Sequence, residues 1–304
     1  MAVVIEELLR TGSSCHSIHA PDESPREVQT MSPKNAVPLR ELLRVKPGSK
    51  FRLAKIDPDE THGRDKESAA ADLEAGLARL TDLQDRLWAE AKHPVLIVLQ
   101  GIDAAGKDGS IRHVMTAFNP MGCTVTSFKV PTPVELGHDY LWRVHQRTPG
   151  KGEIAIFNRS HYEDVLVVRV HDIVPKAVWS RRFDQINAFE ELLTASGTTI
   201  IKFFLWIDRD EQRKRFQERI DDPAKRWKFR LGDLEERKLW NDYEAAFEDA
   251  LRHCSTRAAP WYVIPSNRNW FRNLAIAEIV GDTLADLEPR YPPSEEDLTG
   301  VVVE

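Results

Sequence analysis

The chain alternates between short apolar runs and longer amphipathic segments, and this alternation is its main structural signal. Residues 94–100, PVLIVLQ, form a continuous apolar run, which is typical of a strand buried on both faces. Residues 66–92 instead repeat leucines at spacings of three and four, which predicts a helix. Further strands are expected at 123–130, 153–160, 198–207 and 261–265, and further helices at 110–118, 133–146, 179–196, 209–222, 234–254 and 270–287.

This order of elements predicts one α/β domain. Strands that alternate with helices imply a parallel sheet covered by helices on both faces. Right-handed crossovers bring the carboxyl ends of the strands to one edge, where ligands bind in such sheets. Because residues 11–38 are polar and rich in serine and proline, we expect 1–38 to be a flexible extension. Residues 39–291 are expected to form the domain, and 292–304 an acidic tail.

Composition narrows the class of protein. The chain has 304 residues, of which 41% are apolar and 30% charged, as in globular proteins. No apolar run approaches the roughly 18 residues of a membrane span, so we expect no membrane association. The first residues lack the features of a signal peptide, and the three cysteines are scattered. These features predict a cytoplasmic protein with reduced thiols.

The sequence GIDAAGKDGS, residues 101–110, has the context of a phosphate-binding P-loop. It follows the apolar run 94–100 and precedes a predicted helix, and Gly101, Gly106 and Lys107 match the spacing of that motif. A glycine-rich turn that only packs strand against helix is the alternative, but strand, glycines, lysine and helix all agree with a P-loop. The residues predicted to contact phosphate are Gly101, Ala104, Ala105, Gly106, Lys107, Asp108, Gly109 and Ser110.

The residue after Lys107 is Asp108, where a P-loop usually has the hydroxyl that binds magnesium. Asp103 lies inside the loop, and an acid that faces phosphates needs a cation between them, so we predict that Asp103 binds Mg²⁺. An aspartate that only stabilises the turn is the rival interpretation. We expect Asp108 to be a first-turn acid favoured by the helix dipole, and Gly109 to leave room for a bulky anion.

A second polar group, FNRSHYED at residues 157–164, follows another predicted strand. Asn158 stands where a P-loop protein usually has a metal-directed acid, and Arg159 suits a transferring phosphate. Glu163 and Asp164 are predicted to restore the missing charge as magnesium ligands. Ser160 and Glu163 also have the spacing of a helix capping box, and both interpretations can hold together.

Basic residues are concentrated in one segment, although the net charge is −6. Residues 213–230 hold eight bases and three acids, whereas residues 276–304 hold eight acids and one base. A solvated helix face would explain such a segment, and nucleic-acid binding would fit its mixture of bases with Trp227 and Phe229. Because a P-loop is present, we favour a lid, about 213–238, that closes cations over phosphates. Its candidate residues are Lys225, Arg226, Lys228, Arg230 and Arg237.

Three further bases, Arg112, Lys129 and Arg143, are expected near the same edge of the sheet. Each alone is most simply a surface charge, but together they could line a groove for a polyanion.

The motifs resemble those of the family-2 polyphosphate kinases over about residues 38–291. The matching stretches are GIDAAGKDG, HVMTAFNPMGCTV, SFKVPT, FNRSHYEDVLVVRVH, IDDPAKRWKFRLGDLEERKLW and APWYVIPSNRNWF. The resemblance implies a three-layer, thymidylate-kinase-like P-loop fold with a helical lid. It implies transfer of a phosphoryl group between inorganic polyphosphate and a purine nucleotide with Mg²⁺, or Mn²⁺ in its place, by a homodimer or homotetramer. The residues expected to act in catalysis are Asp103, Lys107, Asn158, Arg159, Glu163 and Asp164.

The pair Asn158 and Glu163 bears on the acceptor, because many family members carry aspartate and asparagine at these positions. The exchange looks like the class III subgroup, which phosphorylates nucleoside mono- and diphosphates such as AMP, ADP, GMP and GDP. Polyphosphate is then expected on the loop, with the nucleotide opposite. An ATP-dependent nucleoside monophosphate kinase, a nucleic-acid-binding protein and an inactive P-loop scaffold are the alternatives.

Overall fold

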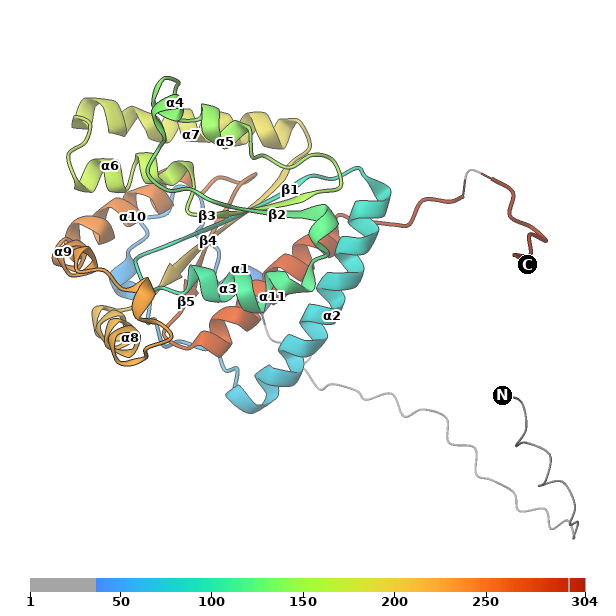
Figure 1. Ribbon diagram of the computed structural model, residues 1–304, viewed down its shortest axis with the longest axis horizontal. Helices are drawn as coiled ribbons and strands as arrows, with labels where there is room; N and C mark the ends of the chain where they lie inside the picture. Colours follow the sequence, from blue (N-terminus) through green and yellow to red (C-terminus); the bar gives the residue numbers. More distant parts are fainter. Residues whose placement is uncertain (1–36, 295, 304) are drawn as a thin grey trace, which may run out of the picture. The chain divides into compact units, whose positions relative to one another are not determined.

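The computed structural model describes residues 37–294 and 296–303, so the predicted extension lies outside the described residues except for its last two positions (Figure 1). Its centre is a five-stranded sheet in the order β2-β3-β1-β4-β5, in which all pairings are parallel. This arrangement confirms the parallel sheet. The strands are β1 (Val95–Gly101), β2 (Cys123–Ser127), β3 (Ile154–Asn158), β4 (Thr199–Trp206) and β5 (Trp261–Pro265).

Helices cover both faces of the sheet and make three layers. One layer holds α1 (Leu39–Leu42), α2 (Lys66–Glu90), α3 (Lys107–His113) and α11 (Asn269–Asp286), of which α2 and α11 pack along much of their length (Figure 1). The other layer holds α6 (Val167–Val170), α7 (Lys176–Ala195) and α10 (Trp240–Cys254). The remaining helices are α4 (Pro133–Leu136), α5 (Trp142–His145), α8 (Arg209–Asp221) and α9 (Gly232–Lys238). Short 3₁₀ turns are η1 (Leu53–Lys55), η2 (Met115–Ala117), η3 (Pro120–Gly122), η4 (His161–Asp164) and η5 (Arg226–Lys228).

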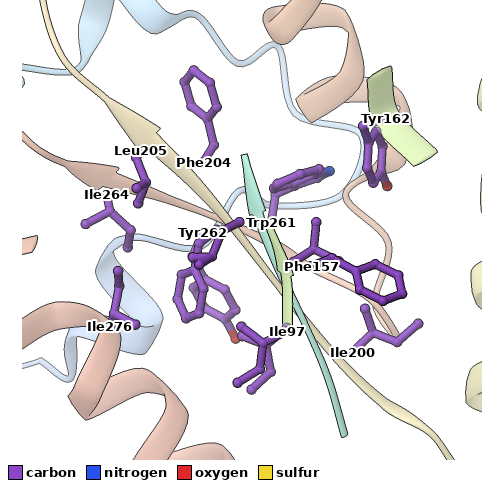
Figure 2. Close-up of a cluster of buried hydrophobic side chains, with 14 of the residues drawn as sticks. Ile97, Phe157, Tyr162, Ile200, Phe204, Leu205, Trp261, Tyr262, Ile264 and Ile276 are labelled. Atoms are coloured by element: carbon purple, nitrogen blue, oxygen red, sulfur yellow. The ribbon is translucent and has the colours of Figure 1, made fainter. Parts of the chain in front are cut away.

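The apolar runs form the core, as their pattern predicted. Every residue of β1 is buried, because this central strand has a helical layer on each side. Figure 2 shows Ile97, Phe157, Ile200 and Phe204 gathered around the sheet with Trp261 among them. The carboxyl ends of β1, β3 and β4 therefore emerge side by side at one edge, on a tightly packed base.

Residues 43–45 cover the outer edge of β5, a feature that the sequence pattern did not indicate. Val45 N donates to Trp261 O at 2.8 Å, and Val263 N donates to Leu43 O at 2.9 Å. This antiparallel bridge pairs backbone groups that an edge strand would otherwise leave open.

The prediction of continuous helices at 133–146 and 234–254 was wrong. In the first segment α4 ends before Gly137, and the side chain of Asp139 accepts from the backbone N–H groups of Leu141 and Trp142 to start a new turn. In the second, the chain turns at Leu239, where the exposed helix α9 gives way to α10 and its buried Trp240. The helix predicted at 110–118 starts earlier, at Lys107, and ends at His113.

The described residues contain no helix that is both long enough and apolar enough to cross a membrane. Cys123 and Cys254 are free thiols, and Cys15 lies outside the described residues.

Candidate active site

The P-loop connects the end of β1 to the start of α3, as the sequence predicted. Gly106 and Ala104 have φ angles of 109° and 66°, so the loop passes twice through the left-handed region. The side chain of Lys107 folds back into the loop, where Nζ donates to Gly101 O at 2.6 Å and to Ile102 O at 3.3 Å. Burial and the nearby Arg159 lower the pKa of Lys107 to about 8. The loop thus holds one buried amine whose pKa lies well below that of an exposed lysine.

Helix α8 holds the loop from the other side. Arg215 Nη1 donates to Ala104 O at 2.8 Å and Ala105 O at 3.1 Å, and Gln212 Nε2 donates to Asp103 O at 3.0 Å. Because these side chains occupy the carbonyls of successive loop residues, they fix the backbone of the loop without any ligand.

Asp103, Arg159 and Glu163 meet at the mouth of the loop, as predicted. Arg159 Nη2 lies 2.7 Å from Asp103 Oδ1, and its Nη1 lies 3.3 Å from Glu163 Oε2. Gln100, the last side chain of β1, donates to Glu163 Oε1 at 3.1 Å. Arg159 itself has a φ of 62°, a rare conformation for a residue with a side chain, which turns the chain sharply after β3. Two carboxylates therefore face one pocket and share one guanidinium.

Asp164 does not join them, so its prediction as a metal ligand was wrong. Consecutive residues of a 3₁₀ helix point about 120° apart, so Glu163 and Asp164 on η4 face different sides. Asp164 Oδ1 accepts from Arg182 Nη1 of α7 at 2.9 Å, and burial raises the pKa of this carboxyl to about 6. The described part of the chain contains no cluster of three or more histidine, cysteine or acidic side chains suited to a metal.

The two remaining carboxylates still fit Mg²⁺, which commonly takes one or two protein carboxylates and completes its shell with water and substrate phosphates. Asp103 and Glu163 would hold the ion, since both line the same pocket and already neutralise one cation there, Arg159.

Asn158 and Ser160 make contacts that the sequence did not predict. Asn158 Nδ2 donates to Asp108 Oδ1 at 2.9 Å, so the residue after Lys107 connects the loop to the end of β3. The predicted capping box is absent, because Ser160 Oγ accepts from Tyr162 N while the carboxylate of Glu163 turns to Gln100 and Arg159. The acid is thereby free to act in the site instead of capping a helix.

Gly109 and one of the three groove bases, Arg143, differ from prediction. The side of Gly109 that lacks a side chain faces the guanidinium of Arg272, where a Cβ would lie 3.0 Å from Nη2, so the expected space for an anion is filled. Arg143 is buried and donates to Lys129 O at 2.8 Å, which supports the chain after β2 and rules it out as a free phosphate ligand. Arg112 and Lys129 are exposed, and their role in a groove stays a prediction.

The predicted lid residues fall into two groups. Three of them have partners: Lys225 pairs with Asp222 at 2.9 Å, Arg226 donates to Ile220 O, and Arg237 donates to Gln212 Oε1. Lys228 and Arg230 are exposed, and their side-chain nitrogens have no carboxylate within 4.0 Å among the residues that the structure describes. These two cations are therefore available for an anionic ligand.

Sequence reasoning missed a buried polar cluster beneath η4. Lys202 Nζ donates to Glu190 Oε2 at 2.5 Å, Tyr162 Oη at 2.8 Å and Cys254 O at 2.7 Å. His161 Nε2 lies 3.2 Å from Glu190 Oε1. A single lysine in the apolar run 198–207 was the signal that could have revealed it. Because the cluster fastens the residues directly before Glu163, it positions that carboxylate.

Comparison with known proteins agrees with this geometry. A family model described as polyphosphate kinase 2 matches residues 63–292. The chain is 54% identical to an AMP/ADP-polyphosphate phosphotransferase of Meiothermus ruber, over 86% of this chain and 98% of that protein. It is 44% identical to an ADP-polyphosphate phosphotransferase of Rhodopseudomonas palustris, over 82% and 91% of the two chains.

A solved structure has the same architecture. The crystal structure of polyphosphate kinase 2 from Arthrobacter aurescens TC1 superposes with a TM-score of 0.83 at 43% identity, over 87% of this chain and 95% of that one. Fold, P-loop and sequence agree over most of the chain, and the protein belongs to the polyphosphate kinase 2 family.

Proposed function

We propose that the protein transfers phosphoryl groups between inorganic polyphosphate and both nucleoside mono- and diphosphates, with Mg²⁺. The acceptors would be AMP and ADP, and the corresponding guanine nucleotides as well. The observation that carries the proposal is the pairing of Asp103 and Glu163 across Arg159, at the mouth of a P-loop that has no hydroxyl after Lys107. The two relatives named for AMP/ADP- and ADP-polyphosphate transfer support the choice of donor.

The transfer needs no covalent intermediate on the protein. A terminal phosphate oxygen of the nucleotide attacks the terminal phosphorus of the polyphosphate chain, and a new P–O bond forms. The bond from that phosphorus to its bridging oxygen breaks, and the shortened chain leaves with the electron pair. Positioning and neutralisation of charge supply most of the rate in such reactions.

The position of each residue in the site suggests its role in the transfer. Lys107, inside the loop, would place a charge beside the bridging oxygens of the donor, and Arg159 would contact the phosphoryl group in transfer. Mg²⁺, held by Asp103 and Glu163, would neutralise phosphate oxygens when bound. Lys228 and Arg230 would close over the ligand from the lid.

The position of Glu163 supports acceptance of both nucleotide lengths. Asn158 is neutral and its amide is occupied by Asp108, whereas the carboxylate of Glu163 reaches the pocket four residues after Arg159. The charge directed at the metal therefore comes from η4 instead of from the end of β3, and this matches the exchange expected of the class III subgroup.

A donor and acceptor screen tests the proposal. The purified protein is supplied with Mg²⁺, either polyphosphate or ATP as donor, and AMP, ADP, GMP or GDP as acceptor, and products are separated by chromatography. We expect diphosphates and triphosphates from polyphosphate, and little transfer from ATP to AMP. Transfer from ATP alone would identify a nucleoside monophosphate kinase, and formation of triphosphates only would remove AMP and GMP from the acceptors.

A further inference from the structure

Arg272 is a buried cation that has only neutral hydrogen-bond partners. It lies in the first turn of α11, and 3% of its surface is exposed. Nη1 donates to Asn269 Oδ1 at 2.6 Å, and Nη2 donates to Asn273 Oδ1 at 3.0 Å. Within residues 37–294 and 296–303, no carboxylate lies within 4.0 Å of its guanidinium. A buried charge without a counter-charge is unfavourable, so this position calls for an explanation.

The guanidinium lies directly against the P-loop. A Cβ added to Gly106 would stand 2.0 Å from Nη1 of Arg272, and a Cβ added to Gly109 would stand 3.0 Å from Nη2. Glycine is therefore needed at position 106, both for this approach and for its φ of 109°, and a side chain at position 109 would press on the guanidinium. Two positions of the loop motif make room for one arginine.

A second buried arginine gives a useful comparison. Arg215 also touches the loop, but it has a counter-charge in Glu211, at 2.8 Å, and it donates to the carbonyls of Ala104 and Ala105. Its role in holding the backbone is thus complete without a ligand. Arg272 makes no such contact with the loop carbonyls, and its charge is left uncompensated beside an element that binds anions.

We propose that Arg272 is a positioning residue for the donor: its buried charge acts through Gly106 and Gly109 on the phosphate chain held by the loop. Lys107 lies at the Gly101 end of the loop and Arg272 at the Gly106–Gly109 end, so the two cations serve successive phosphate units. Both cations raise the affinity for an extended polyanion, whereas they add little to the affinity for the acceptor nucleotide on the opposite side. The inference rests on the proposed use of polyphosphate as donor.

A packing role predicts different behaviour. If Arg272 only fills space and joins Asn269 to Asn273, its replacement lowers the stability of the fold and leaves the affinity for each substrate nearly unchanged. If the charge of Arg272 acts on the donor, its replacement instead lowers the affinity for the polyanion selectively. That affinity should also depend less on salt concentration, because one cation fewer is neutralised on binding.

The test compares Arg272→Gln and Arg272→Lys with a control, Arg79→Gln. Arg79 is exposed and pairs with Asp282 on α11, away from the loop. The KM for polyphosphate, the KM for ADP and kcat are measured over a range of salt concentrations, with a thermal unfolding curve for each variant. We expect Arg272→Gln to raise the KM for polyphosphate about tenfold and the KM for ADP less than twofold, with a shallower salt dependence, and Arg272→Lys to restore most of the loss.

A normal KM for polyphosphate in folded Arg272→Gln would overturn the inference, as would an equal rise for both substrates. If that variant does not fold, Gly109→Ala decides. Its added Cβ must displace the guanidinium by a few tenths of an ångström, so a normal KM for polyphosphate in folded Gly109→Ala also overturns the inference. Wild-type protein that uses no polyphosphate would instead refute the proposed function.

Discussion

The two sides of the site differ in how their charges are held. The base consists of the P-loop, residues 157–164 and the buried cluster of Lys202 and Glu190 beneath them. It satisfies its cations internally: Lys107 with loop carbonyls, Arg159 with two acids, and Lys202 with Glu190. The lid, about residues 213–238, exposes Lys228 and Arg230 to solvent. The base is therefore preformed, whereas Lys228 and Arg230 of the lid have no carboxylate beside their side-chain nitrogens in the part of the chain that the structure describes.

Packing follows the same division. Phe157 and Tyr162, at the base, are completely buried, but Trp227 and Leu231 of the lid are 76% and 79% exposed. Few buried apolar contacts mean that little free energy opposes movement of a segment. In the proposed function, the buried side would organise the chemistry, and the exposed lid cations would contact the polyanion.

The largest expected effect is at the base. Among the described residues, Lys107 has the only side-chain amine that lies inside the loop. We therefore expect Lys107→Ala to lower kcat/KM for polyphosphate about 10²–10³-fold or more. The variant should stay folded, which circular dichroism checks alongside the rate. Near-normal activity would contradict the assigned site, and binding of DNA or RNA that is salt-sensitive and survives this change would favour the nucleic-acid alternative.

The second effect is on stability. Lys202→Met leaves Glu190 buried without its main counter-charge, which costs about 3–5 kcal/mol in comparable cases. Denaturation in urea measures the loss, with Arg86→Gln as control, since the exposed pair of Arg86 and Asp82 contributes about 0–1 kcal/mol. A double change of Lys202→Met and Glu190→Leu should recover part of the stability. A loss below about 1 kcal/mol in the single variant would show that the cluster does not support the base.

In contrast to Lys202→Met, changes in the lid should affect substrate binding and leave stability nearly unchanged. Changing Lys228 and Arg230 together to glutamine should raise the KM for polyphosphate about three- to tenfold, and alter the free energy of unfolding by less than about 0.5 kcal/mol. Lys238→Gln is the matched control, because Lys238 is also exposed but pairs with Glu235. Equal effects in control and test variants would remove the distinction between free and paired lid cations.

The smallest effect is a dependence on pH. Because the pKa of Lys107 is lowered to about 8 by burial, the free protein carries this charge below pH 8 and loses it as the pH rises through that value. We expect kcat/KM for polyphosphate to fall about twofold between pH 7 and 8, and further above. In Lys107→Arg the side chain stays charged, so an unchanged alkaline fall in that variant would assign it to another group.

Local features of the fold could be read from the sequence, because they depend on residues that are close in the chain. The apolar run of β1, the glycines and Lys107 together defined the P-loop, and Arg159 with Glu163 was found at its mouth. The expected capping box at Ser160 failed because an arginine from the same turn competes for Glu163. A charge-assisted contact outweighed a local pattern.

Features that join distant segments could not be read in this way. Glu190 and Lys202 lie on different elements, and the local sequence around each residue does not predict that the two will pair. Arg272 belongs to an apolar helix far along the chain from Gly109, so its approach to the loop depends on how α11 packs. Asp164 was misassigned because the geometry of a single 3₁₀ turn decides which of two adjacent acids faces the pocket.

The strand order also sets when this site can first exist during synthesis. β1 pairs with β3 and β4, so the loop sequence leaves the ribosome well before the strands that support it. Arg272 follows Gly109 by more than half the chain, which at about 5–20 residues per second is a delay on the order of 10 s. The nascent chain therefore passes through a period with a phosphate-binding sequence but no phosphate-binding site. If Arg272 has the role proposed above, helix α11 is the element that completes the site.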